Sequence, residues 1–115
     1  MKLRWADEAL EDMDHWHEND IEIWKKVRAF IKRIQRDPDD RWGRPKALQR
    51  ELKGWWSRRI NDHDRLVYRV VHESRTAVLE ILQCRGHYGD DDDGRPGKTA
   101  TRAPTPKPRK KSDRK

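Results

Sequence analysis

Two short runs of interleaved apolar and cationic residues, joined by four polar residues, occupy the middle of the chain. The runs are residues 55–60 and 65–71, and Asn61, Asp62, His63 and Asp64 lie between them. Alternating runs joined by a short polar segment predict a β-hairpin. Because side chains alternate along a strand, one face of the second run carries Leu66, Tyr68 and Val70 and the other carries Arg65, Val67, Arg69 and Val71. We therefore expect a sheet with one face in the core and a basic opposite face.

The remaining elements follow from periodicity. Residues 1–6 alternate as a strand, and apolar residues then recur at helical spacing up to Asn19 and again over residues 21–36. Asn19 and Asp20 supply a stop and a cap, and Pro38 ends the second helix. Further strands are expected at residues 48–52 and 77–85. This order predicts an α+β fold in which two N-terminal helices pack on a mostly antiparallel sheet.

Residues 89–115 differ in composition from the rest of the chain. They begin with an acidic run at 90–93, end with a basic run at 107–115, and contain no large apolar side chain. Such a segment cannot bury enough apolar surface to offset the entropy that it would lose on ordering. We therefore expect one folded domain over residues 1–88, followed by a disordered tail over 89–115 that is acidic and then basic.

Charge and cysteine content indicate an anionic partner and a reducing compartment. Residues 1–88 carry 19 Lys and Arg against 16 Asp and Glu, and the tail carries 9 against 5. A basic surplus of this kind favours nucleic acid as the partner. Cys84 is the single cysteine, so an internal disulfide is impossible. Without an apolar leader or a run long enough to span a bilayer, the chain is expected to be cytoplasmic and not to bind membranes.

Four segments along residues 1–88 carry a family resemblance: MKLRWADEALEDMDHW, GRPKALQRELKGWWSRRI, HDRLVYRV and CRGHY. Together they resemble the YoeB/Txe family, small toxins of bacterial type II toxin-antitoxin pairs in the RelE superfamily. The resemblance implies a RelE-like fold and the activity of a ribosome-dependent messenger-RNA endonuclease that cuts in the ribosomal A site without a metal or other cofactor. It also implies a YefM-like antitoxin as partner, besides ribosome and messenger, and it allows a homodimer.

The resemblance assigns three catalytic residues. RNA cleavage by the adjacent 2′-hydroxyl needs a base for the hydroxyl proton, a cation beside the phosphorane and an acid for the 5′-oxygen. The family pattern places the cation at Arg65 and the acid and its positioning at His87 and Tyr88. A planar guanidinium binds two phosphate oxygens at once, and an imidazole exchanges protons near neutral pH.

One position departs from the family pattern. The family has a glutamate as general base in a Gly-x-Pro-Glu-x-Leu segment, and Lys46 stands in its place within Gly43–Leu48. A lysine is a poor base unless neighbouring cations and desolvation remove its proton. The base is then His87, a Lys46 that has lost its proton, or Glu51. We favour Lys46 as electrostatic support, with His87 taking more of the proton transfer.

The expected contacts to phosphates of messenger and ribosomal RNA are Arg50, Lys53, Arg58 and Arg59, which would give affinity without sequence readout. Trp55 and Trp56 alternate across a strand, so one is expected in the core and the other at the surface. No metal site is expected, because His15 and His17 are two residues apart on a helix and do not share a face.

Two other functions remain open. A non-enzymatic toxin of the same fold, as in the ParE branch, would act on a protein target such as gyrase. A decayed toxin would keep antitoxin binding and lack activity. The presence of Arg65, His87 and Tyr88 argues against the gyrase-directed toxin, and the replacement of the carboxylate by Lys46 argues faintly for it.

Overall fold

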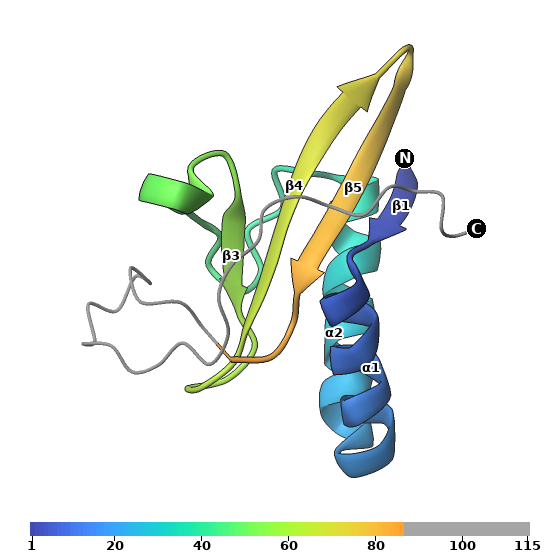
Figure 1. Ribbon diagram of the computed structural model, residues 1–115, viewed down its shortest axis with the longest axis vertical. Coiled ribbons are helices and arrows are strands. Elements are labelled where there is room, and N and C mark those ends of the chain that lie inside the picture. Colours follow the sequence, from blue (N-terminus) through green and yellow to red (C-terminus); the bar gives the residue numbers. More distant parts are fainter. Residues whose placement is uncertain (87–115) are drawn as a thin grey trace.

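The computed structural model describes residues 1–86 (Figure 1). Strand β1 (Lys2–Trp5) precedes helices α1 (Asp7–Asn19) and α2 (Ile21–Arg36), and strands β2 (Lys46–Ala47), β3 (Trp56–Arg59), β4 (Arg65–Glu73) and β5 (Thr76–Gln83) follow, with a 3-10 turn η1 (Arg50–Leu52) between β2 and β3. The predictions for His87, Tyr88 and residues 89–115 lie outside the described residues.

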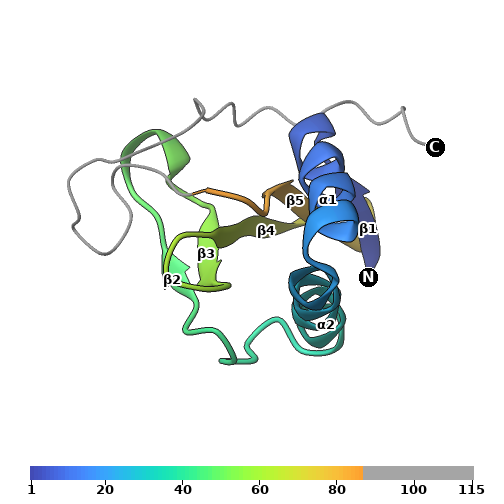
Figure 2. The same cartoon turned by 90° about the horizontal axis from the view of Figure 1, so that it is seen from below.

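The sheet has the strand order β1-β5-β4-β3-β2. Strand β1 runs parallel to β5, and the other pairs are antiparallel. Helices α1 and α2 lie on the same side of this sheet (Figure 2). The predicted α+β class, with two N-terminal helices on a mostly antiparallel sheet, is confirmed.

The principal core lies between the helices and the sheet. Its members on the strands include Leu66, Tyr68, Leu79 and Ile81, and α2 contributes apolar residues at helical spacing, Val27, Phe30, Ile31 and Ile34. The face predicted for Leu66 and Tyr68 is therefore confirmed. Helix α2 begins where Asp20 Oδ1 accepts a hydrogen bond from the Ile23 N–H at 3.3 Å, and it ends before Asp37 and Pro38, as expected.

The opposite face of the sheet, here called the outer face, has a small core of its own. It consists of Leu48, Leu52, Trp55, Val67 and Leu82. The prediction of a strand over residues 48–52 is wrong, because this segment folds over the outer face through Leu48 and Leu52 and has Arg50 at a φ of +57°, which is incompatible with a strand. The prediction that one of the two adjacent tryptophans is buried is confirmed, since Trp55 is 2% exposed and Trp56 is 42% exposed.

Helix α1 fixes the end of β5. The Trp16 Nε1–H donates to the carbonyl oxygen of Cys84 at 2.9 Å, and the Cys84 N–H donates to Asp12 Oδ2 at 2.9 Å. All three residues are buried. A buried hydrogen bond is costly to break, because no water replaces the lost partner. These two bonds therefore fix where the chain leaves the sheet.

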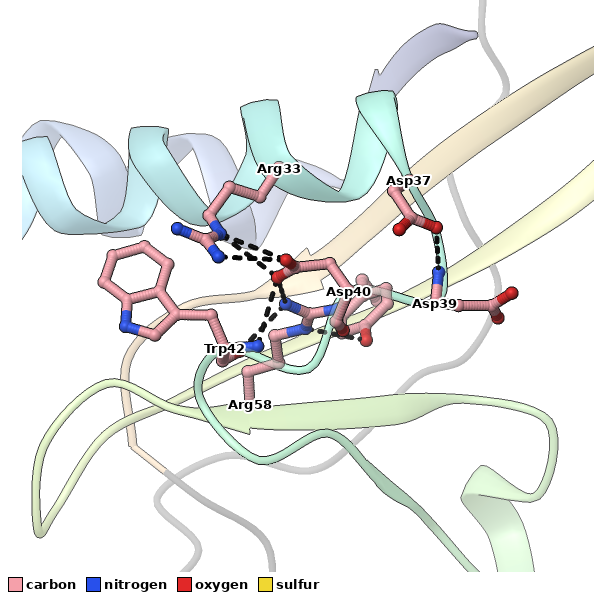
Figure 3. Close-up of polar contacts among 7 residues, drawn as sticks. Arg33, Asp37, Asp39, Asp40, Trp42 and Arg58 are labelled. Carbon is pink, nitrogen blue, oxygen red and sulfur yellow. Dashed lines mark hydrogen bonds and ion pairs between the residues drawn. The ribbon is translucent and has the colours of Figure 1, made fainter.

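The connection between α2 and β2 is held by a buried arginine. Figure 3 shows Asp40 between Arg33 of α2 and Arg58 of β3, and both guanidinium groups donate to its carboxylate at 3.0 Å. The side chain of Arg58 is fully buried and also donates to the carbonyl oxygens of Asp40 and Trp42 and to the Tyr68 hydroxyl. The loop is thus bound to β3 at several points.

Gly43 allows this loop to pass close to α2. Its φ is +85°, and an added Cβ would lie 2.7 Å from the ring of Phe30. The Gly43 carbonyl oxygen accepts from the Arg59 N–H at 2.9 Å. Only glycine fits both the backbone conformation and the space. The loop therefore fixes the position at which β2 begins.

Replacing Arg58 with Ala should strongly destabilise the fold. The substitution removes the four hydrogen bonds that Arg58 donates to Asp40, Trp42 and Tyr68 and leaves a cavity, so we expect a loss of about 3 kcal/mol or more in the free energy of unfolding. Urea unfolding followed by tryptophan fluorescence measures this loss. The matched control is Arg59→Ala, whose side chain is 42% exposed and which should cost less than about 1 kcal/mol. Equal losses in both variants would contradict this assignment.

Asp40 should make the fold sensitive to acid. The hydrogen bond from Arg33, with those from the Trp42 N–H and Arg58, holds the pKa of Asp40 well below its usual range. Because the pKa is lower in the folded chain than in the unfolded one, near 3.9, this stabilisation is complete above that value and is lost as pH falls below it.

The stability difference between the wild-type protein and Asp40→Asn should be largest at about pH 6 and shrink below about pH 4. Chemical unfolding across this range measures it. Asp39→Asn is the control, because the exposed Asp39 side chain points away from the Asp40 carboxylate (Figure 3). A difference for Asp40→Asn that is the same at both ends of the range would refute the expectation.

Candidate active site

Strand register places two rows of side chains on the outer face. Lys46 of β2 pairs with Ser57 of β3, and Ser57 pairs with Val67 of β4. In the next row Arg59 pairs with Arg65. With strands about 4.8 Å apart and a rise of about 3.4 Å per residue, the backbones of Lys46 and Arg65 lie roughly 12 Å apart. Two long side chains span that distance together.

Arg65 begins β4 with its side chain turned toward the hairpin turn. Its Nη1 donates to the carbonyl oxygens of Asn61 at 2.8 Å and Asp64 at 3.1 Å, and the residue is 2% exposed. Arg65 therefore lies on the face predicted to be basic, with its guanidinium held inward by the turn carbonyls. A cation that is fixed before the reaction is what stabilisation of a charged transition state requires.

Arg59 lies directly opposite Arg65 on the same face. Its guanidinium pairs with the exposed Asp62 at 3.2 Å. Like charges opposite each other destabilise a sheet, and an exposed ion pair offsets little of that repulsion. A bound anion such as a phosphate relieves it. This end of the β3–β4 hairpin therefore favours an anionic ligand.

The described part of the chain ends beside Arg65. The Arg65 N–H donates to the carbonyl oxygen of Gly86 at 2.9 Å, and the Gly86 N–H donates to Asp64 Oδ1 at 2.8 Å. Gly86 has a φ of +80°, a conformation that glycine adopts readily. His87 and Tyr88 lie outside the described residues. His87 is nevertheless covalently attached to a residue that is hydrogen-bonded to Arg65.

The other predicted site residues divide into exposed and buried groups. Lys46, Arg50, Glu51, Lys53 and Arg59 are exposed. Arg58 is fully buried in its contacts with Asp40 and Tyr68, so the expectation that it contacts RNA is wrong. Arg58 is buried because it lies on the helix side of the sheet, where it pairs with Leu66. Arg59, the next residue, lies on the outer side, where it pairs with Arg65.

Ion pairs occupy the far end of the outer face. Glu80 of β5 accepts from Arg4 of β1 at 2.7 Å and from Arg69 of β4 at 2.6 Å, and the Arg69 guanidinium lies 4.3 Å from the ring of Trp55. Arg69 was expected to be part of the basic face, but its charge is matched by Glu80. Arg4 also pairs with Glu73 at 2.7 Å, so the two arginines at this end are matched by two glutamates.

Sequence reasoning missed Asp64 as a site residue. It assigned residues 61–64 to the turn as a group. In the structure Asn61 stabilises the turn, since its Oδ1 accepts from the N–H groups of His63 at 2.7 Å and Asp64 at 2.8 Å. The Asp64 carboxylate instead contacts Gly86, 22 residues away. The one available signal was its position immediately before Arg65.

A separate pocket lies on the helix side of the sheet. Its volume is about 490 Å³, and its apolar lining includes Trp56, Tyr68, Val70, Pro38 and Pro45. Side-chain alternation along β4 puts Tyr68 and Val70 on the opposite face from Arg65. The pocket is therefore not part of the candidate active site.

Comparison with known proteins identifies relatives over the same region. Residues 5–88 match the family model for the YoeB-like toxin of bacterial type II toxin-antitoxin systems. The chain is 43% identical over 88 residues to Toxin YoeB of Escherichia coli (strain K12), which covers 76% of this chain and 100% of the relative.

Solved structures agree with this match. A YoeB/ParE toxin from Agrobacterium tumefaciens has a TM-score of 0.72 at 36% identity and covers 76% of this chain and 100% of its own. YoeB of Staphylococcus aureus, solved as a dimer and in a heterotetrameric YoeB-YefM complex, has TM-scores of 0.66 and 0.67 at 32% identity, covering 76% of this chain and 98% of that chain.

Neither helix within residues 1–86 has the length and apolar character that a membrane span requires.

Proposed function

The chain belongs to the family of YoeB-like toxins of bacterial type II toxin-antitoxin systems, and we propose that it acts as a ribosome-dependent endoribonuclease that cuts messenger RNA in the ribosomal A site. One observation carries the proposal: Lys46, Arg59 and Arg65 share the outer face, and Gly86, which precedes His87, is hydrogen-bonded to Arg65. We assign this activity to a domain over residues 1–88.

Cleavage uses the ribose 2′-hydroxyl of the messenger and needs no metal. The 2′-oxygen bonds to phosphorus, and the bond between phosphorus and the 5′-oxygen breaks with its electron pair on that oxygen. The products are a 2′,3′-cyclic phosphate and a 5′-hydroxyl. Arg65 stabilises the charge that builds up on the phosphorane, with Arg59 beside it. His87 and Tyr88 supply the proton for the leaving oxygen and position the scissile phosphate.

Lys46 acts in this site as a cation rather than as the base. Its place in the row of Ser57 and Val67 directs it to the face of Arg65, where it adds positive charge for the phosphate. His87 then accepts the proton of the 2′-hydroxyl and returns it to the leaving oxygen. Arg50 and Lys53, which belong to η1 and the residue after it, contact phosphates of messenger or ribosomal RNA.

The partners follow from the relatives. YoeB of Staphylococcus aureus forms a complex with YefM and has been solved as a dimer. We extend both associations to this chain: a YefM-like antitoxin covers the cationic end of the outer face, and two copies form a homodimer. An acidic antitoxin segment would relieve the repulsion between Arg59 and Arg65 as a phosphate does.

Purified protein should cut a translated message within the ribosomal A site, as read by primer extension. Arg65→Ala should lower the cleavage rate at saturating ribosomes by about 100-fold or more, because its charge matters most when the phosphorane forms, while ribosome affinity changes little. Arg65→Lys keeps the charge but loses the planar, bidentate guanidinium, so its cleavage rate should lie between those of the wild-type protein and Arg65→Ala. Circular dichroism checks folding of both variants.

Intact messages in the presence of the wild-type protein and ribosomes would refute the proposal. Loss of DNA supercoiling by gyrase in the same preparation would assign the protein to a gyrase-directed activity instead. If neither is observed but the antitoxin still binds, the chain is a decayed toxin.

Lys46→Glu should keep or raise the cleavage rate. It restores the carboxylate that serves as general base in the family, and general-base catalysis contributes roughly 10²- to 10⁴-fold when geometry permits. Single-turnover cleavage on ribosomes measures the rate, and Lys46→Ala, expected to lose less than about tenfold, is the matched control. Should both variants abolish cleavage, Lys46 is itself essential and its role as electrostatic support is wrong.

A further inference from the structure

The segment before His87 is held on both sides by buried or half-buried groups. Cys84 is bound to Asp12 and Trp16 of α1 through its N–H and its carbonyl oxygen. Two residues later the Gly86 N–H donates to Asp64 Oδ1 at 2.8 Å, and the Gly86 carbonyl oxygen accepts from the Arg65 N–H at 2.9 Å. The path from β5 to Gly86 is therefore set by groups of α1 and of the β3–β4 turn.

Gln83 adds to this hold from the end of β5. The side chain is 1% exposed, and its Nε2 donates to the carbonyl oxygens of Arg85 at 3.0 Å and Gly86 at 3.3 Å. These bonds all act on carbonyl groups. The Asp64 carboxylate instead accepts from the Gly86 N–H, so it restrains the amide group of Gly86 rather than its carbonyl.

The turn itself is fixed by other groups. Asn61 Oδ1 accepts from the N–H groups of His63 and Asp64, and the Asp64 carbonyl oxygen accepts from the Ile60 N–H at 3.0 Å. Each of these bonds survives when the Asp64 side chain is removed. The carboxylate therefore links the turn to Gly86 without being required for the turn.

We propose that Asp64 is a positioning residue, whose carboxylate holds the Gly86 backbone beside Arg65, at the point from which the chain continues to the catalytic residues His87 and Tyr88. The proposal rests on the proposed function. One peptide unit of 3.8 Å separates successive Cα atoms, so a shift of Gly86 passes almost directly to His87. Proton transfer needs heavy atoms within about 2.6–3.2 Å, and a misplacement of about 1 Å costs roughly 100-fold in rate.

The φ of Gly86 gives a second reason for such a restraint. Glycine at +80° has access to many other backbone conformations, so the segment would lose this geometry without hydrogen bonds on both sides. A charge-assisted bond from a backbone N–H to a carboxylate is about twice as strong as a neutral one. The Asp64 carboxylate thus provides a charge-assisted hydrogen bond at Gly86, a residue that could otherwise adopt many backbone conformations.

Two substitutions at one position test the proposal. Asp64→Ala deletes the acceptor, and Asp64→Asn keeps an Oδ1 acceptor without the charge. In single-turnover cleavage on ribosomes, Asp64→Ala should lower the rate at saturation by roughly 10- to 100-fold with ribosome affinity within about twofold, and Asp64→Asn should recover most of the rate. Amide hydrogen exchange of Gly86 should accelerate in Asp64→Ala and stay protected in Asp64→Asn.

The matched control is Asp37→Ala. It removes a bond of the same kind, from the Asp39 N–H to Asp37 Oδ1 at 3.0 Å, at the end of α2 (Figure 3). Its cleavage rate should equal that of the wild-type protein. A loss of rate in this control as large as in Asp64→Ala would show a general effect of stability and overturn the proposal.

Unchanged protection of the Gly86 amide in Asp64→Ala would overturn the proposal whatever the activity. Lost protection with an unchanged saturated rate would overturn it as well, because Gly86 would then not position the catalytic groups. A wild-type protein that leaves messages intact refutes the proposed function and the catalytic consequence of Asp64, and the exchange of Gly86 still reports separately whether Asp64 holds the chain.

Discussion

The buried guanidinium of Arg58 determines how the two parts of this fold meet. Moving a charge out of water is costly unless polar groups replace the water, and here the carboxylate and carbonyl of Asp40, the carbonyl of Trp42 and the hydroxyl of Tyr68 do so. Because Asp40 is also bound by Arg33 of α2, the cluster joins the helix layer, the connecting loop and the sheet. The loop then enters β2 in a fixed register.

The sheet separates structural from functional chemistry. On its helix side, charged groups are buried and matched, and a pocket lined by Trp56 and Tyr68 remains. On its outer side, Arg59 and Arg65 face each other at one end, while Glu73 and Glu80 pair with Arg4 and Arg69 at the other.

Helix α1 contributes to the site without carrying any of its residues. Asp12 and Trp16 fix Cys84, and the turn before β4 fixes Gly86, so groups distant in sequence hold the segment that precedes His87. The family match over residues 5–88 extends across all these groups. The site therefore depends on long-range contacts, and a local peptide containing the motif would not reproduce it.

The sequence by itself determined the two helices, the hairpin over β3 and β4, the fold class and the family, because these depend on local periodicity, turn residues and a motif read in order. It did not distinguish Arg58 from Arg59, since adjacent cations look alike until strand pairing assigns each to a face. It also predicted a strand at residues 48–52, where burial of Leu48 and Leu52 against Trp55 overrides local propensity. The contact of Asp64 was hidden for the same reason: its partner Gly86 is 22 residues away, and only tertiary packing brings a turn carboxylate to that amide.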